Sequence, residues 1–156
     1  MFLRNVISSL AFVGLAVTTN AYANQVNMHA SACAASGNGM MNAYVQSSFV
    51  SAISGTESLT CPVPFTYSSA TSVVIYVDGK NLVTQTTAPN CVATVLHYND
   101  QVVGQVTRTA PLTAGSWELG FTLTGSTLPS VWDYITLECT VSSSIYGGLL
   151  GYTIVN

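Results

Sequence analysis

Four aromatic side chains offer the first candidate chemistry in this sequence. Tyr76, Tyr98, Trp132 and Tyr134 fall on the parity opposite to the apolar residues of the strands predicted around them, so we expect them on an outward sheet face. Exposed aromatic rings stack on sugar rings or form a contact patch for a protein. They can also cover a sheet beneath a loop, which is a structural role. Trp132 and Tyr134, two residues apart on one predicted strand, are the favoured pair for binding.

Acidic and imidazole groups offer a second chemistry. Glu118 and Glu138 occupy polar positions of two predicted strands, and two carboxylates at a suitable separation can hydrolyse a glycosidic bond. His97 beside Asp100 has the residue types of a general base. However, both glutamates point outward by parity, where burial would not raise a pKa, and no G-x-S-x-G, H-E-x-x-H, P-loop or G-x-G-x-x-G pattern is present. The sequence predicts no catalytic residue and no enzyme.

The cysteines indicate disulfides rather than a metal site. The chain has four of them: Cys33, Cys61, Cys91 and Cys139. An even number in an exported chain predicts two disulfides, and sequence alone allows three pairings. Cys33–Cys61 with Cys91–Cys139 is favoured because sequential pairing keeps both loops moderate. No C-x-x-C spacing occurs and only two histidines could assist, so neither a metal nor another cofactor is predicted.

Residues 1–23 have the features of a cleaved signal peptide. A basic residue precedes an apolar stretch too short for a stable membrane anchor, and Ala21-Tyr22-Ala23 is the small-x-small pattern before a cleavage site. Cleavage after Ala23 leaves residues 24–156 as one disulfide-stapled domain. An uncleaved anchor and lipidation at Cys33 are the alternatives. We expect a secreted, periplasmic or surface-exposed protein with no membrane span in its mature part, and whether it is retained or released stays open.

The charge of the chain restricts its partners. Only 6% of the residues are charged, against about 25% in an average soluble protein. Lys80 and Arg108 are the basic residues beyond the expected signal peptide. Two separated cations cannot supply the positive stripe that nucleic acid or an anionic membrane requires, so neither is an expected partner. An uncharged, hydroxyl-rich surface suits self-association, polysaccharide or another surface protein, and the sequence does not choose among them.

Alternation of apolar and polar residues predicts the elements that must position these groups. It is found in five segments: residues 72–79, 91–98, 101–109, 117–124 and 131–141. The first is expected to turn at Asp78-Gly79, the second and third to form a hairpin around Asn99-Asp100, and the chain to end in a further strand. Residues 42–53 fit a helix or a strand, and their composition favours a strand. The spacing of turns predicts an all-β fold, a single antiparallel β-sandwich of about seven to nine strands, immunoglobulin-like or jelly-roll-like.

Residues 59–65, LTCPVPF, combine an inward-facing cysteine with two prolines. Because proline cannot donate to a central ladder, the strand must end or run at an edge just after Cys61, where the disulfide anchors it. This Cys-Pro-x-Pro step is followed by a V-V-I-Y-V strand, a mid-chain cysteine and a late L-E-C-T-V strand, and it is preceded by a signal peptide and an early cysteine. In this order of features the chain resembles a group of short uncharacterised exported bacterial proteins with a Cys-Pro-x-Pro step. The resemblance implies an exported β-sandwich and no known activity. A fainter similarity to pilus subunits rests on the threonine content, the disulfides and the alternating last strand.

Two functional hypotheses follow. The leading one is a non-enzymatic exported module with a structural, adhesive or interaction role and an unknown ligand. The alternative is a carbohydrate-binding module that uses aromatic side chains on a sheet face.

Overall fold

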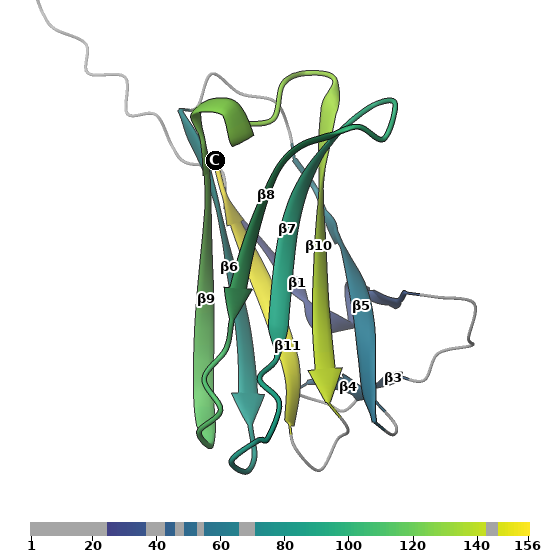
Figure 1. Ribbon diagram of the computed structural model, residues 1–156, viewed down its shortest axis with the longest axis vertical. Coiled ribbons are helices and arrows are strands. Elements are labelled where there is room, and N and C mark those ends of the chain that lie inside the picture. Colours follow the sequence, from purple (N-terminus) through teal and green to yellow (C-terminus); the bar gives the residue numbers. More distant parts are fainter. Residues whose placement is uncertain (1–24, 37–42, 46–48, 53–54, 66–70, 143–146) are drawn as a thin grey trace, which may run out of the picture.

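The computed structural model describes residues 25–36, 43–45, 49–52, 55–65, 71–142 and 147–156. The expected signal peptide lies outside these residues. The described residues form two facing antiparallel sheets with two short 3-10 helices, η1 (Ala30–Ala32) and η2 (Gly125–Thr127) (Figure 1). Neither of these described helices has the length and apolar character required to cross a membrane.

The sheets contain six and five strands. Sheet A consists, in spatial order, of β3 (Ala43–Val45), β4 (Val50–Ala52), β11 (Gly147–Val155), β6 (Ser72–Asn81) and β9 (Gly115–Thr124), with β1 (Gln25–His29) also paired to β11. Sheet B consists of β2 (Ala34–Ala35), β5 (Thr56–Val63), β10 (Asp133–Ser142), β7 (Asn90–His97) and β8 (Val102–Thr109). The predicted all-β antiparallel sandwich is confirmed.

The strand order is that of a jelly roll. Counted from β4, each early strand pairs with its counterpart from the end of the chain: β4 with β11, β5 with β10, β6 with β9, and β7 with β8. This nesting places β4-β11-β6-β9 against β5-β10-β7-β8. The structure thus selects the jelly-roll topology from the two that the sequence left open, and adds the short strands β1, β2 and β3. Residues 42–53, expected as one strand, contain two short strands, β3 and β4, that pair with each other.

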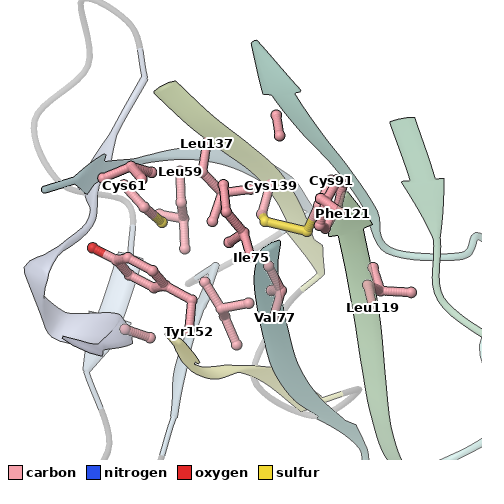
Figure 2. Packing of buried hydrophobic residues seen from close by; sticks show 14 of the residues in the cluster. Leu59, Cys61, Ile75, Val77, Cys91, Leu119, Phe121, Leu137, Cys139 and Tyr152 are labelled. Atoms are coloured by element: carbon pink, nitrogen blue, oxygen red, sulfur yellow. A yellow bond between two sulfur atoms is a disulfide. The ribbon is translucent and has the colours of Figure 1, made fainter. Parts of the chain in front are cut away.

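The alternating residues of both sheets meet in one core. Ile75, Val77 and Phe121 of sheet A and Leu137 of sheet B are fully buried, and Figure 2 shows them around the Cys91–Cys139 disulfide. Their neighbours in sequence point outward, as the exposure pattern of β6 and β9 shows. Since each buried aliphatic or aromatic side chain contributes about 1.5–3 kcal/mol, this core sets the register that fixes which side chains reach the surface.

Both disulfides have the pairing favoured from the sequence. Cys91 and Cys139 lie opposite each other on β7 and β10, and Cys33–Cys61 ties the segment before β2 to β5. Strand β5 ends at Val63, just after its cysteine, as the two prolines predict. The hydroxyl of Tyr152, whose ring is buried in the core (Figure 2), donates a 2.5 Å hydrogen bond to the carbonyl oxygen of Pro62. The proline-containing end of β5 is therefore held by a disulfide and by a tyrosine of the opposite sheet.

The turn expected at Asp78-Gly79 is wrong, because β6 continues through both residues to Asn81. Gly79 lies opposite Trp117 on β9, and a Cβ atom at Gly79 would come within 2.0 Å of the Trp117 ring. The Trp117 indole Nε1–H donates a 3.0 Å hydrogen bond to Asn81 Oδ1. Gly79 is thus required by the packing of the buried Trp117 indole. The Asp78-Gly79 dipeptide, although typical of a turn, does not form one here.

Candidate functional site

Among the residues that the structure describes, the two most exposed aromatic side chains lie together at one end of the sandwich. Tyr98 follows β7 in the β7–β8 hairpin, Trp132 lies in the turn that enters β10, and Figure 1 shows these two segments at the same end. The side chains are 71% and 67% exposed. The Tyr98 backbone N–H donates a 3.0 Å hydrogen bond to the Trp132 carbonyl oxygen, so the main chain holds the rings side by side, with centroids 6.4 Å apart and planes at 65°.

The expected pairing of Trp132 with Tyr134 on one strand face is not found. Strand β10 begins at Asp133, so Trp132 belongs to a turn, while Tyr134 lies on the outer face of sheet B and is 40% exposed. The Tyr134 hydroxyl donates a hydrogen bond to Asp100 Oδ1, and this bond raises the pKa of Tyr134. Asp100 has a φ of 63° at the hairpin tip, a conformation that aspartate tolerates better than most residues. Tyr134 therefore supports the hairpin that carries Tyr98.

A third ring completes the arrangement. The His97 and Tyr98 ring centroids are 4.4 Å apart, with planes at 57°. His97, Tyr98 and Trp132 line a hollow of about 530 Å³, and we call these three residues the aromatic cup. Because each ring is tilted relative to its neighbour, the cup presents a concave set of ring faces and edges rather than one flat surface.

Asp133 fixes the base of the aromatic cup. Its Oδ1 atom lies 2.6 Å from His97 Nδ1, its Oδ2 atom accepts a 2.7 Å hydrogen bond from the Ser130 backbone N–H, and its side chain is 5% exposed. The Ser130 N–H and, after it, His97 hold the pKa of Asp133 below its usual value. Since an ionised carboxylate only accepts, His97 Nδ1–H is the donor in this contact. The side-chain partner of His97 is therefore Asp133, and not Asp100, the neighbour considered from the sequence for a general base.

The remaining candidates lie elsewhere. Tyr76 is on β6, on the outer face of sheet A, and is 38% exposed. Glu118 is on the outer face of sheet A and Glu138 on the outer face of sheet B. Because the two glutamates point away from opposite sides of the sandwich, the hydrolytic pairing considered from the sequence is excluded. Among the described residues, no group of three or more histidine, cysteine or acidic side chains could hold a metal ion.

The rim of the aromatic cup offers polar atoms but no cation. Within the described ranges, Tyr98 Oη and Trp132 Nε1 make no hydrogen bond to the protein. The guanidinium of Arg108 is engaged with the carbonyl oxygens of Gly120 and Thr107. Both carboxylates next to the cup are already hydrogen-bonded. The site combines aromatic faces with neutral donors and acceptors. Sequence reasoning considered His97 but missed its contact with Asp133, because 36 residues separate the two.

Comparisons with known proteins concern the fold. No protein-family model matches the sequence, and the search of curated proteins gave no match. The structure is similar to the C-terminal family 6 carbohydrate-binding module of the laminarinase LamC from Zobellia galactanivorans, with a TM-score of 0.53, 13% identity, and coverage of 85% of this chain and 100% of that one. A family 36 module of a multidomain xylanase from the hindgut metagenome of Trinervitermes trinervoides gives a TM-score of 0.46 at 9% identity, over 85% of this chain and 97% of that one. At such identities the first likeness defines the class of fold, a β-sandwich. The resemblance to exported Cys-Pro-x-Pro proteins stays a prediction.

Proposed function

We propose that the mature protein is a non-enzymatic, exported carbohydrate-binding module whose aromatic cup holds a neutral sugar. The observation that carries the proposal is the cup itself: three adjoining rings, two of them more than two-thirds exposed, held in place by a buried carboxylate. Exposed aromatic side chains that lie next to one another usually mark a binding site, because apolar surface is costly to leave in water.

The chemistry of the aromatic cup suits a sugar. Ring faces contact the C–H faces of a pyranose, while Tyr98 Oη, Trp132 Nε1 and His97 Nε2 can exchange hydrogen bonds with its hydroxyl groups. The Asp133 contacts and the Tyr98–Trp132 backbone hydrogen bond orient the rings in advance. Such preorganisation lowers the entropy lost on binding.

Charge favours a neutral ligand over an acidic one. A uronic acid or sulfated sugar is normally held by arginine or lysine, and neither lines the cup. Asp100 and Asp133 instead place negative charge close to it. An anionic polysaccharide would therefore meet repulsion without a compensating ion pair.

The fold likeness supports the carbohydrate-binding alternative better than the structural or adhesive reading that the sequence favoured. Both hypotheses share a non-enzymatic, exported module. The two disulfides fit an oxidising compartment outside the cytoplasm.

Titration of the mature protein with neutral and acidic polysaccharides tests the proposal. We expect binding to a neutral glycan, and a loss of about 30-fold in affinity for Trp132→Ala and for Tyr98→Ala, since truncation of a central aromatic contact costs about 2 kcal/mol. Leu112→Ala is the matched control, because Leu112 is also an exposed apolar residue, 43% exposed, outside the cup. Binding that Trp132→Ala leaves intact, or preference for acidic glycans, would contradict the proposal.

A further inference from the structure

Two carboxylates lie next to the aromatic cup. Asp133 lies at its base, with Oδ1 2.6 Å from His97 Nδ1 and the side chain 5% exposed. The hydrogen bond from the Ser130 backbone N–H and then the contact with His97 lower the pKa of Asp133, so this carboxylate is ionised at neutral pH. Asp100 adds a second carboxylate at the tip of the β7–β8 hairpin, two residues after Tyr98. The cup therefore lies in a region of negative charge.

The exposed Asp100 side chain has an oxygen atom available to a ligand. Its Oδ1 atom accepts the hydrogen bond from the Tyr134 hydroxyl, and no group of the described residues donates to Oδ2. A hydrogen bond from a neutral phenol leaves the charge of the carboxylate in place. The Asp100 backbone N–H donates a 2.8 Å hydrogen bond to the His97 carbonyl oxygen, which holds the hairpin tip in place. The backbones of Asp100 and Tyr98 are at most about 7 Å apart, within the screening length of about 8 Å at physiological salt.

The lysine and arginine of the described residues, Lys80 and Arg108, lie away from the cup. Lys80 is one residue before the end of β6, and Figure 1 shows that end of β6 at the opposite end of the sandwich from the β7–β8 hairpin. Arg108 is six residues after the start of β8 at Val102, about 20 Å along the strand, and its guanidinium donates to the carbonyl oxygens of Gly120 and Thr107. Neither cation can neutralise the carboxylates at the cup, so a positively charged ligand group would complete the site.

The rings of the aromatic cup suit a cation as well as a sugar. A cation is attracted to the face of a tryptophan or tyrosine ring when it lies within about 6 Å of the ring centre. The Tyr98 and Trp132 ring centroids are 6.4 Å apart, with planes at 65°, so a cation in the hollow of about 530 Å³ can lie within that range of both rings. This attraction adds to that of the carboxylates, and a neutral sugar gains neither.

We propose that the aromatic cup binds most tightly a sugar that carries an ammonium group, as an amino sugar with an unacylated nitrogen does. The ammonium group lies against the rings of Tyr98 and Trp132 and close to Asp100, while the sugar ring and its hydroxyl groups make the contacts described for a neutral sugar. The inference rests on the proposed function, because the same cup holds the sugar and the ammonium group is the added feature. The resulting order of affinity is cationic sugar, then neutral sugar, then acidic sugar.

Asp100→Asn removes one negative charge with little change in shape. Asparagine adopts a φ of 63°, the value at Asp100, as readily as aspartate does, and its Oδ1 atom can still accept the hydrogen bond from Tyr134. Glu118→Gln is the matched control, because it changes the net charge of the protein by the same amount on the outer face of sheet A, outside the cup. A comparison of the two variants separates local charge at the cup from total charge.

Calorimetric titration of the mature protein at neutral pH tests the inference with two glucosamine oligosaccharides of equal length. One carries N-acetyl groups and is neutral, and the other carries N-trimethylammonium groups, whose charge does not depend on pH. We expect the wild type to bind the cationic form about tenfold more tightly at low salt, and added salt to reduce this advantage. Asp100→Asn should reduce the advantage to about threefold or less without changing the affinity for the neutral form. Glu118→Gln should retain the advantage, and Trp132→Ala should weaken the binding of both forms.

The outcomes separate this inference from the proposed function. Equal affinity for the two forms, with both weakened by Trp132→Ala, would overturn the ammonium preference while the proposed function stands. An advantage of the cationic form that Asp100→Asn leaves intact would overturn the assignment of Asp100. Tetramethylammonium chloride is the probe for a free ammonium ion, and binding as tight as that of the cationic oligosaccharide would overturn the sugar as the source of the ammonium group. Failure of both oligosaccharides to bind would overturn the inference alone, because the titration with neutral polysaccharides decides the proposed function.

Discussion

Asp133→Asn should loosen the aromatic cup and destabilise the protein in a pH-dependent manner. The carboxylate makes two short contacts, to His97 and to the Ser130 backbone N–H, and its side chain is 5% exposed. A hydrogen bond to a charged group contributes about 1.5–3 kcal/mol when both partners are buried. Ser130 is exposed and His97 is 30% exposed, so water can replace part of each bond. We therefore expect a loss of about 2 kcal/mol in the free energy of unfolding near neutral pH.

The pH dependence follows from the direction of the Asp133 pKa shift. The pKa of Asp133 is lower in the folded state than the ordinary aspartate value of 3.8. The carboxylate therefore stabilises the fold fully above that value, and the stabilisation is lost as pH falls through the folded pKa. The difference between wild type and Asp133→Asn should shrink as pH is lowered from neutral to about 2.

Urea unfolding of both proteins across this pH range, with intact disulfides, measures the effect. Sugar affinity should fall together with stability at neutral pH, because the ring of His97 and the turn of Trp132 lose their common anchor. Equal stability at neutral pH, or a difference that does not change with pH, would refute the assignment of Asp133 as the ionised base of the cup.

Three further predictions concern the scaffold. Tyr152→Phe removes the hydrogen bond to Pro62 and should cost about 1 kcal/mol; because burial raises the pKa of Tyr152 to about 12 from 10.0, the wild type should lose more stability than the variant as pH rises from 10 through 12 in an alkaline unfolding series. Gly79→Ala should destabilise by about 1–3 kcal/mol, since its Cβ meets the Trp117 ring at 2.0 Å; unchanged near-ultraviolet circular dichroism and unchanged stability would contradict this packing. Replacing Cys91 and Cys139 together by alanine should cost about 2–5 kcal/mol in thermal unfolding, and a loss no larger than that of an exposed substitution would show that the disulfide contributes little.

Local features of the sequence predict the strands and their faces. In segments such as residues 117–124, every second residue is apolar, and these residues are buried in β9 as expected. The prolines after Cys61 predict where β5 ends, because their missing N–H groups are a local property. The β7–β8 hairpin is likewise set by nearby residues.

Long-range pairing is what the sequence does not reveal. Alternation of apolar and polar residues indicates which face of a strand a residue occupies, but not which sheet contains the strand. The sequence therefore left Glu118 and Glu138 as possible neighbours, although β9 and β10 belong to different sheets. The same limit hid the contact between His97 and Asp133. The prediction of a turn at Asp78-Gly79 was wrong for a related reason, because the side chain that requires glycine at position 79 is that of Trp117, on another strand.

The indole N–H signals of the protein give the most direct test of the central claim. The chain contains two tryptophans: Trp132 in the aromatic cup, 67% exposed, and Trp117 in the core, 7% exposed. In a ¹H–¹⁵N titration with a neutral oligosaccharide, the account predicts a saturable shift of the Trp132 signal while the Trp117 signal stays in place as an internal control. A Trp132 signal that does not move with any neutral glycan that binds the protein would contradict it.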